Sequence, residues 1–231
     1  MSVSLISVVL PVGNPTLSMV ARLQDYLTSL GGLEATFELL PVIDRTHLDK
    51  PPESFRALSE CEPRIRTLFV DAAGWGHSVQ RGLSEARGEL LCYTNLARTS
   101  SADLRTVLNH GLKHPNSVIK ANRRIKDGFI PRLGSLLYVV ECRWLFDLAY
   151  WDINGTPKVF PRELRKLLAL KSEDDLVDLE FDVVCRREGY PVLEVPLSTI
   201  DRRTDFDHIG LMSALHLYAG AFRLWRQMRV Q

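Results

Sequence analysis

The fold class is decided by residues 66–104, which read RTLFVDAAGWGHSVQRGLSEARGELLCYTNLARTSSADL. The apolar run at 68–70 predicts a short strand, and the apolar stripe of Val79, Leu83 and Ala86 predicts a helix that ends at Gly88. Residues 89–94 predict the next strand, and a polar loop follows it. Because ligands of open α/β sheets bind at the carboxyl ends of strands, we expect the functional loop at residues 94–101.

The alternation of strands and helices continues on both sides of this stretch. Strands are predicted at residues 5–10, 37–43, 117–120, 158–160 and 190–196. Helices are predicted at 16–30, 102–112 (capped by Ser101), 135–149, 176–187 and 210–229, with another beginning at Pro161 and one helical turn near 55–58. This order predicts an α/β fold with a parallel, doubly wound sheet. No repeat or linker divides the sequence, so we expect one domain over residues 1–231.

The composition favours a soluble protein of a reducing compartment. The chain has 231 residues, 45% of them hydrophobic, and a net charge of +1, so it can bury a full core and has no overall attraction to nucleic acid. Its four cysteines form no CxxC pair, which favours free thiols over disulfides or a zinc site. Pro11 interrupts the first apolar run, and no window of about 20 uninterrupted apolar residues exists, so we expect a cytoplasmic protein with neither signal peptide nor spanning helix.

Common enzyme signatures are absent from the sequence. It contains no GxxxxGK[ST], HExxH or GxSxG motif, and no GxGxxG motif beside the first strand. The pair Gly74 and Gly76 is, taken alone, typical of a tight turn before a helix.

Four segments in order resemble the family 2 glycosyltransferases of the GT-A fold, particularly the polyprenyl-phosphate branch that includes dolichol-phosphate mannosyltransferases. They are SVVLPVGN (7–14), the glycine turn and helix of 74–88, DINGTPKVF (152–160), and residues 188–196 followed by Asp201 and Arg202. The resemblance implies a GT-A fold with a mostly parallel sheet, and transfer of a sugar from a nucleotide-diphosphate donor. It implies a nucleotide-binding half at about residues 1–115 and an acceptor half at about 116–231.

The resemblance also assigns the donor-binding residues. Pro11, Asn14 and Asp44 are expected to line the base pocket, and Gly76 lies in the glycine turn. Asp44 alone is equally typical of a turn cap.

The metal-binding Asp-x-Asp of the family aligns with Asn95-Leu96-Ala97, where this sequence departs from it. Asn95 offers one neutral carbonyl oxygen and Ala97 offers none, so a Mg²⁺ or Mn²⁺ site of the usual kind is not supported. In one account Arg98 supplies the missing charge near the diphosphate, joined by Arg123 or Arg124, Arg132 and Ser135. In the other, the site has decayed and the protein binds without turnover. Taken alone, Arg98 is typical of a solvated loop cation.

The second half of the chain is expected to hold the acceptor. By resemblance, Asp152 is a candidate base, Lys158 a phosphate contact, and Arg202 matches an arginine of the polyprenyl-phosphate enzymes. Asp205, Asp207 and His208 depart from that branch, which leaves the lipid-phosphate acceptor open. Glu180 and Asp182 are alternative carboxylates, predicted on the exposed side of a helix.

The last helix carries Trp225 among Arg223, Arg226 and Arg229. This pattern fits either contact with a membrane surface or a helix packed across the sheet with a basic end. The sequence therefore predicts a nucleotide-diphosphate-sugar transferase; the alternatives are a non-catalytic relative that binds a nucleotide-sugar or a partner protein and, ranked last, a nucleotidyltransferase.

Overall fold

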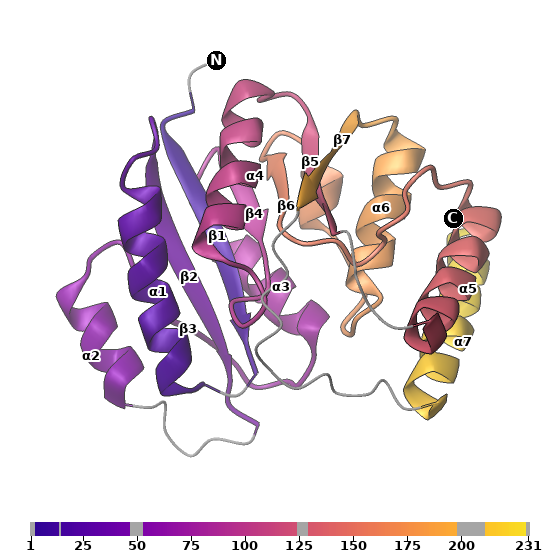
Figure 1. The fold of residues 1–231 in the computed structure, drawn as a ribbon, viewed down its shortest axis with the longest axis horizontal. Helices are drawn as coiled ribbons and strands as arrows, with labels where there is room; N and C mark the ends of the chain where they lie inside the picture. Colours follow the sequence, from indigo (N-terminus) through magenta and orange to yellow (C-terminus); the bar gives the residue numbers. More distant parts are fainter. Residues whose placement is uncertain (1–2, 14, 47–52, 124–128, 198–210, 230–231) are drawn as a thin grey trace.

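The computed structural model of the chain describes residues 3–13, 15–46, 53–123, 129–197 and 211–229 (Figure 1). These residues form one sheet of seven strands in the order β3-β2-β1-β4-β6-β5-β7. The strands are β1 (Leu5–Val12), β2 (Thr36–Asp44), β3 (Leu68–Val70), β4 (Leu90–Tyr93), β5 (Val118–Arg123), β6 (Lys158–Pro161) and β7 (Val192–Leu197).

The sheet is parallel except at β6. Strand β1 pairs in parallel with β2 and β4, β2 with β3, and β5 with β7, whereas β6 runs antiparallel to both β4 and β5. The mostly parallel α/β sheet expected from the sequence is thus confirmed. The prediction of a wholly parallel sheet is wrong, because β6 is antiparallel. The carboxyl ends of β1, β2, β3, β4 and β5 consequently share one edge of the sheet with the beginning of β6.

Helices cover both faces of the sheet. Apolar side chains of α1 (Leu17–Leu30), α2 (Glu53–Cys61) and α4 (Ser101–Lys113) pack on one face in a cluster that includes Val8, Leu39 and Ile119. Those of α3 (Trp75–Glu85), the 3₁₀ turn η1 (Arg165–Leu168) and α6 (Val177–Glu188) pack on the other, around Val9, Val42 and Phe160. The alternation of β1 residues between the two clusters is the two-residue period of a strand.

A third layer lies outside α6. Helices α5 (Phe129–Phe146) and α7 (Leu211–Arg229) lie side by side at one end of the molecule (Figure 1). Their side chains, including Tyr138, Cys142 and Leu224, form a third cluster with Leu179 and Val183 of α6. Helix α6 is therefore buried on opposite faces, between the sheet and the helical pair.

Several predicted elements differ in extent. Residues 53–61 form a full helix where a single turn was predicted, and the cap of α4 is Ser100, which accepts a hydrogen bond from the Asp103 N–H. Helix α5 begins at Phe129, six residues before its predicted start. No long helix follows Pro161, because Pro161 ends β6 and only the short η1 comes after it.

Candidate functional site

The shared edge of the sheet brings together the first predicted site residues. Pro11 lies in β1 beside Val42 of β2, and Asp44 is the last residue of β2. The Asp44 carboxylate accepts hydrogen bonds from the Thr46 N–H (2.8 Å) and hydroxyl (2.6 Å), so it closes a local turn. Asp44 is 8% exposed. Beside it, Arg45 forms a bidentate pair with Asp71 at the end of β3.

The loop after β4 is fixed by its own hydrogen bonds. The side-chain oxygen of Asn95 accepts from the N–H groups of Ala97 (2.9 Å) and Arg98 (3.2 Å), and Leu96 is buried in the core. The carbonyl of Thr99 accepts from the Tyr26 hydroxyl (2.8 Å) and the Arg22 guanidinium (2.9 Å) of α1. The sequence expectation of a loop at the strand tip is confirmed, and hydrogen bonds join the loop to itself and to α1.

This loop does not fit a divalent metal. The one side-chain oxygen that Asn95 could offer is already used by two backbone donors. Among the residues that the structure describes, no group of three or more His, Cys, Asp or Glu side chains is placed to hold an ion. A hard cation prefers several oxygen ligands, most of them carboxylates, and residues 95–97 of this loop contain no carboxylate.

Arg98 is the cation that the loop presents to solvent. Its side chain is exposed, and within the described parts of the chain its guanidinium makes no hydrogen bond or ion pair. Asp175, on the segment before α6, lies within electrostatic range of it. Burial, Asp178 and Asp174 raise the pKa of Asp175, and Arg98 opposes this shift. Arg98 thus carries an exposed positive charge on the loop after β4, within electrostatic range of Asp175.

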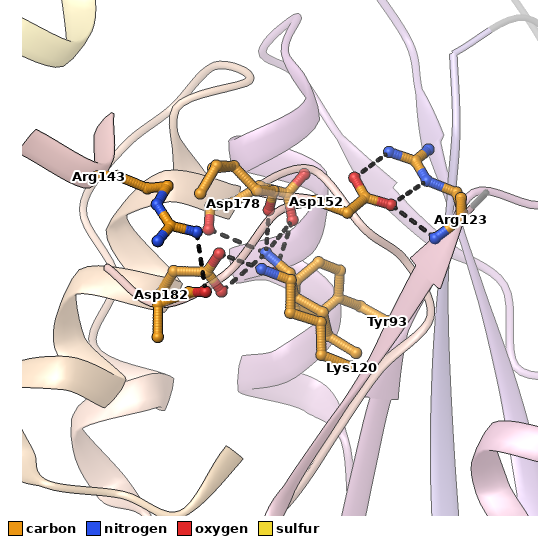
Figure 2. A network of polar contacts seen from close by, with 10 residues as sticks. Tyr93, Lys120, Arg123, Arg143, Asp152, Asp178 and Asp182 are labelled. Atoms are coloured by element: carbon orange, nitrogen blue, oxygen red, sulfur yellow. Dashed lines mark hydrogen bonds and ion pairs between the residues drawn. The ribbon is translucent and has the colours of Figure 1, made fainter. Parts of the chain in front are cut away.

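Asp152 and Arg123 form a closed pair at the end of β5 (Figure 2). The Asp152 carboxylate accepts from the Arg123 N–H and Nε, both at 2.9 Å, and from Nη2 at 2.8 Å. Burial alone would raise the pKa of Asp152, but the hydrogen bonds and charge of Arg123 outweigh it and hold the pKa below its ordinary value. Asp152 is therefore ionised near neutral pH and is a weak proton acceptor.

A buried network of charges lies beneath the edge, between the sheet and α6. The ammonium of Lys120, in β5, donates a hydrogen bond to the Asp182 carboxylate (Figure 2). The ammonium of Lys158, in β6, lies 2.9 Å from Oδ1 of Asp178 and 3.6 Å from Oδ1 of Asp182. The Tyr93 hydroxyl donates to Asp178 at 2.9 Å, as does the Trp75 indole at 3.2 Å. Both lysines are fully buried. Five elements are joined at this point: α3, β4, β5, β6 and α6.

The protonation states of this network follow from burial and pairing. Burial lowers the pKa of Lys158, but Asp178 and Asp182 raise it more, so the pKa stays above its ordinary value. Burial raises the pKa of Tyr93 well above its ordinary value, and Asp178 adds to the effect. Lys158 therefore remains an ammonium and Tyr93 a neutral donor. In this arrangement the charge of Lys158 is balanced by aspartates, and the phosphate contact expected of Lys158 stays a prediction.

The carboxylates of α6 were predicted on an exposed face, and this prediction is wrong. Asp182 is 1% exposed because it receives the two lysines. Glu180 is also buried, and its carboxylate accepts from the N–H groups of Lys171 and Ser172. Asp178 was not singled out from sequence, although Asp178 and Asp182 share one helical face at a spacing of four residues. The signal available in the sequence was that Asp178 and Asp182 lie among apolar residues, which indicates a buried pair of carboxylates.

The absence of a side chain at Gly76 is accounted for by backbone packing. A Cβ atom there would lie 2.1 Å from the carbonyl oxygen of Ser172, and one at Gly74 would lie 2.4 Å from that of Glu173. The segment before α6 therefore occupies the space beside the start of α3. Gly74 also has φ +134°, a conformation that favours glycine.

The remaining predicted residues lie outside what the structure describes. Asn14, Arg124, Arg202 and residues 204–208 are among those not described, as are the side chains of Arg132 and Ser135, whose backbone belongs to α5.

Two cavities lie away from the strand tips. One of about 510 Å³ is lined by Arg143, Tyr150, Cys185 and Arg186, and one of about 420 Å³ by His77, Glu173 and Arg223. Neither lining includes Pro11, Asp44, Asn95 or Arg98. We assign the candidate site to the edge because the topology brings the predicted residues together there.

The fold is the GT-A fold of nucleotide-sugar transferases. The chain aligns with the glucosyl-3-phosphoglycerate synthase of Mycobacterium tuberculosis in complex with UDP (TM-score 0.67, 15% identity, 94% of this chain and 80% of that one). It aligns equally well with that synthase bound to Mg²⁺ and UDP (TM-score 0.68, 17% identity, 94% and 79%). The mannosyl-3-phosphoglycerate synthase of Rubrobacter xylanophilus is similar to the same degree (TM-score 0.67, 17% identity, 99% and 76%).

The similarity is one of structure. No protein-family model matches the sequence, and no curated protein matches it at a significant level. At 15–17% identity the alignments establish the fold, and they do not extend to the polyprenyl-phosphate branch. No helix in the described parts of the chain is long and apolar enough to cross a membrane.

Proposed function

We propose that this protein transfers a sugar from a nucleotide-diphosphate donor to an acceptor that bears a phosphate. The observation that carries the proposal is the exposed, unpaired guanidinium of Arg98 on the fixed loop after β4. In a GT-A fold, this loop lies where the donor diphosphate is expected, and the three neighbouring structures named above are of enzymes named as sugar-phosphoglycerate synthases. The proposed donor lies over the ends of β1, β2 and β4.

The reaction would break the bond between the anomeric carbon and the donor diphosphate and form a bond from that carbon to an acceptor oxygen. The diphosphate leaves with the bonding electrons, and the developing charge must be stabilised. A guanidinium suits this task because its planar fork matches phosphate oxygens. Arg98 is free to provide it, whereas Arg123 is already paired with Asp152. We propose that the donor is bound without a protein-held metal.

The acceptor class follows from the weakness of the available base. A hydroxyl acceptor must lose a proton to a base, but the Asp152 carboxylate is engaged by Arg123 and its pKa is lowered. An acceptor phosphate is already ionised near neutral pH and needs no strong base. A polyprenyl phosphate and a soluble phosphorylated metabolite share this chemistry when a phosphate oxygen is the atom that attacks the anomeric carbon. Incubation with each, in detergent and in buffer, distinguishes them by which one becomes glycosylated.

The second candidate is a relative that binds a nucleotide-sugar or a partner protein without turnover. It is favoured by the engagement of Asp152 and Lys158, which leaves two predicted catalytic and phosphate-binding groups with internal partners. Release of free sugar or formation of glycosylated acceptor from a bound donor would exclude this candidate.

Thermal-shift measurements test the proposal directly. UDP-, GDP- and dTDP-sugars should be added to the purified protein in the presence of EDTA, and separately with Mg²⁺ or Mn²⁺. A ligand that binds the native state at about 100 times its Kd adds about 2.7 kcal/mol of stability, so a bound donor should raise the Tm visibly. We expect at least one donor to raise the Tm in EDTA. Stabilisation that requires metal would contradict the arginine account, and no stabilisation by any donor would contradict the function.

A further inference from the structure

The outer helical pair exposes an unusually apolar surface. Trp144 of α5 is 82% exposed, and Leu136, Leu137, Val140 and Phe222 are between 46% and 54% exposed. Leu137, Val140 and Trp144 follow the spacing of three and four residues that places side chains on one face of a helix. The opposite face of α5, with Tyr138, Val139 and Cys142, is buried in the third cluster. The outward stripe therefore has no packing role within the described molecule.

Helix α7, which packs against α5, exposes aromatic and basic side chains of its own. Phe222 stacks on Trp225 with ring centroids 5.5 Å apart, and the Arg229 guanidinium lies 4.0 Å above the Trp225 ring. Helices α5 and α7 contact each other along the pair, with Tyr138 against Tyr218. We define the α5–α7 surface as Leu136, Leu137, Val140, Trp144, Phe222 and Trp225 with the exposed Arg226 and Arg229.

The charge of the pair is strongly one-sided. Helices α5 and α7 together contain five arginines and one glutamate, Glu141, although the whole chain has a net charge of only +1. A second copy of this chain on the same surface would bring arginines against arginines, which is unfavourable. An anionic surface with an apolar layer beneath it satisfies both features, since arginines remain at the phosphates while tryptophan and leucine enter the acyl boundary.

We propose that the α5–α7 surface binds the face of a bilayer that contains anionic lipids. The helices would lie on the membrane and not across it. The proposal does not depend on the proposed sugar transfer, because it concerns a different part of the molecule and needs no donor.

Vesicle flotation tests this proposal with the full chain. Vesicles of phosphatidylcholine alone are compared with vesicles of equal parts phosphatidylcholine and phosphatidylglycerol. We expect binding to the anionic vesicles, and a loss of about tenfold in partition on Trp144→Ala, because a large apolar side chain is removed. Leu193→Ser on β7 is the matched control, since Leu193 is also exposed (41%) but lies away from the pair. Neither residue is buried, so both variants should fold.

The basic part of the surface is tested separately. Arg226→Gln should weaken binding to anionic vesicles about fivefold, and Arg56→Gln on α2 should not. A blue shift of tryptophan emission on vesicle binding, diminished in Trp144→Phe, would place Trp144 in the lipid. Equal binding of the wild type and Trp144→Ala would overturn the proposal. So would a dimer in sedimentation experiments that Trp144→Ala dissociates, together with no vesicle binding, because the surface would then join two copies.

Discussion

At the scale of single residues, Arg98 and Arg123 differ in whether their charge is available. Arg123 is paired with Asp152, whereas Arg98 is exposed and unpaired within the described residues. We expect Arg98→Ala to weaken binding of a nucleotide-diphosphate sugar about tenfold to a hundredfold, the usual loss for a hydrogen bond to a charged group. Arg98→Lys should recover only part of the affinity, because an ammonium lacks the fork. Isothermal titration measures both, with Arg56→Ala as the control.

The pair of Asp152 and Arg123 predicts a specific pH dependence of stability. Because the pKa of Asp152 is lower in the folded than in the unfolded protein, the pair stabilises the fold above the unfolded pKa. This stability is lost as the pH falls through the folded value, that is, below about pH 4. The wild type should therefore exceed Asp152→Asn in Tm at pH 7, and the difference should shrink in acid.

The exposed pair of Arg45 and Asp71 is the control for this measurement. Asp71 has a side chain that is 74% exposed, so Asp71→Asn should change the Tm little at any pH. A difference between wild type and Asp152→Asn that stays constant down to pH 3 or so would show that Asp152 does not titrate with a lowered pKa.

Asp182 is the residue on which the buried lysines depend. Asp182→Asn removes the ion-pair partner of the buried Lys120 and leaves Lys158 paired with Asp178, and an uncompensated buried charge costs about 3–5 kcal/mol. Denaturant unfolding measures this loss. The double variant Lys120→Met/Asp182→Leu removes one charge of each sign and should be clearly more stable than Asp182→Asn. If the stability lost in the double variant equalled the sum of the losses in Lys120→Met and Asp182→Leu, the two residues would not be coupled, which would contradict an ion network.

At the scale of elements, the contact between α3 and the segment before α6 depends on Gly76. Alanine is the better helix former by about 1 kcal/mol, but its Cβ would lie 2.1 Å from the Ser172 carbonyl oxygen. We expect Gly76→Ala to destabilise the fold by about 1–3 kcal/mol, since neighbouring backbone must shift. Gly31→Ala, with φ −58° and no contact under 3.4 Å, should be neutral or stabilising. Chemical denaturation compares the two.

The elements show what could be predicted from sequence. Strands such as 5–10 and 89–94 were found because a buried parallel strand is a continuous apolar run. The direction of β6 was missed, because a four-residue strand carries no local sign of its orientation. The burial of Asp182 was also missed, because the sequence near Asp182 does not show which residue it contacts. Its partner Lys120 lies 62 residues away, and local periodicity does not report such a contact.

The position of the loop in the candidate site was predictable, but its hydrogen bonding was not. The loop after residues 89–94 was expected at the carboxyl end of the strand, and the topology places it there. That the Asn95 oxygen is consumed by Ala97 and Arg98, and Asp152 by Arg123, depends on backbone geometry that residue types alone do not specify.

At the scale of the whole molecule, α6 joins the sheet to the outer helices. One face carries Asp178 and Asp182 toward Lys158 and Lys120, and another carries Leu179 and Val183 toward the α5–α7 pair. Separating the outer helices would expose that apolar cluster, and separating α6 from the sheet would expose the apolar side chains of Val177 and Phe181 and break the ion pairs. Both separations are costly, so the single domain expected from sequence should unfold cooperatively.

The tryptophans allow this cooperativity to be measured. Trp75 lies in α3 at the sheet, whereas the other three, Trp144, Trp151 and Trp225, lie in or next to the outer pair. The emission of a Trp75→Phe variant therefore reports the outer helices, and a Trp144→Phe/Trp151→Phe/Trp225→Phe variant reports the sheet. In urea, we expect the emission midpoint of each variant to coincide with its own midpoint by far-UV circular dichroism, since Trp75→Phe also removes the indole hydrogen bond to Asp178 and shifts the stability of the whole variant. If the emission of Trp75→Phe changed at a lower urea concentration than the circular dichroism of the same variant, α5 and α7 would unfold first, and α6 would not join the layers into one cooperative unit.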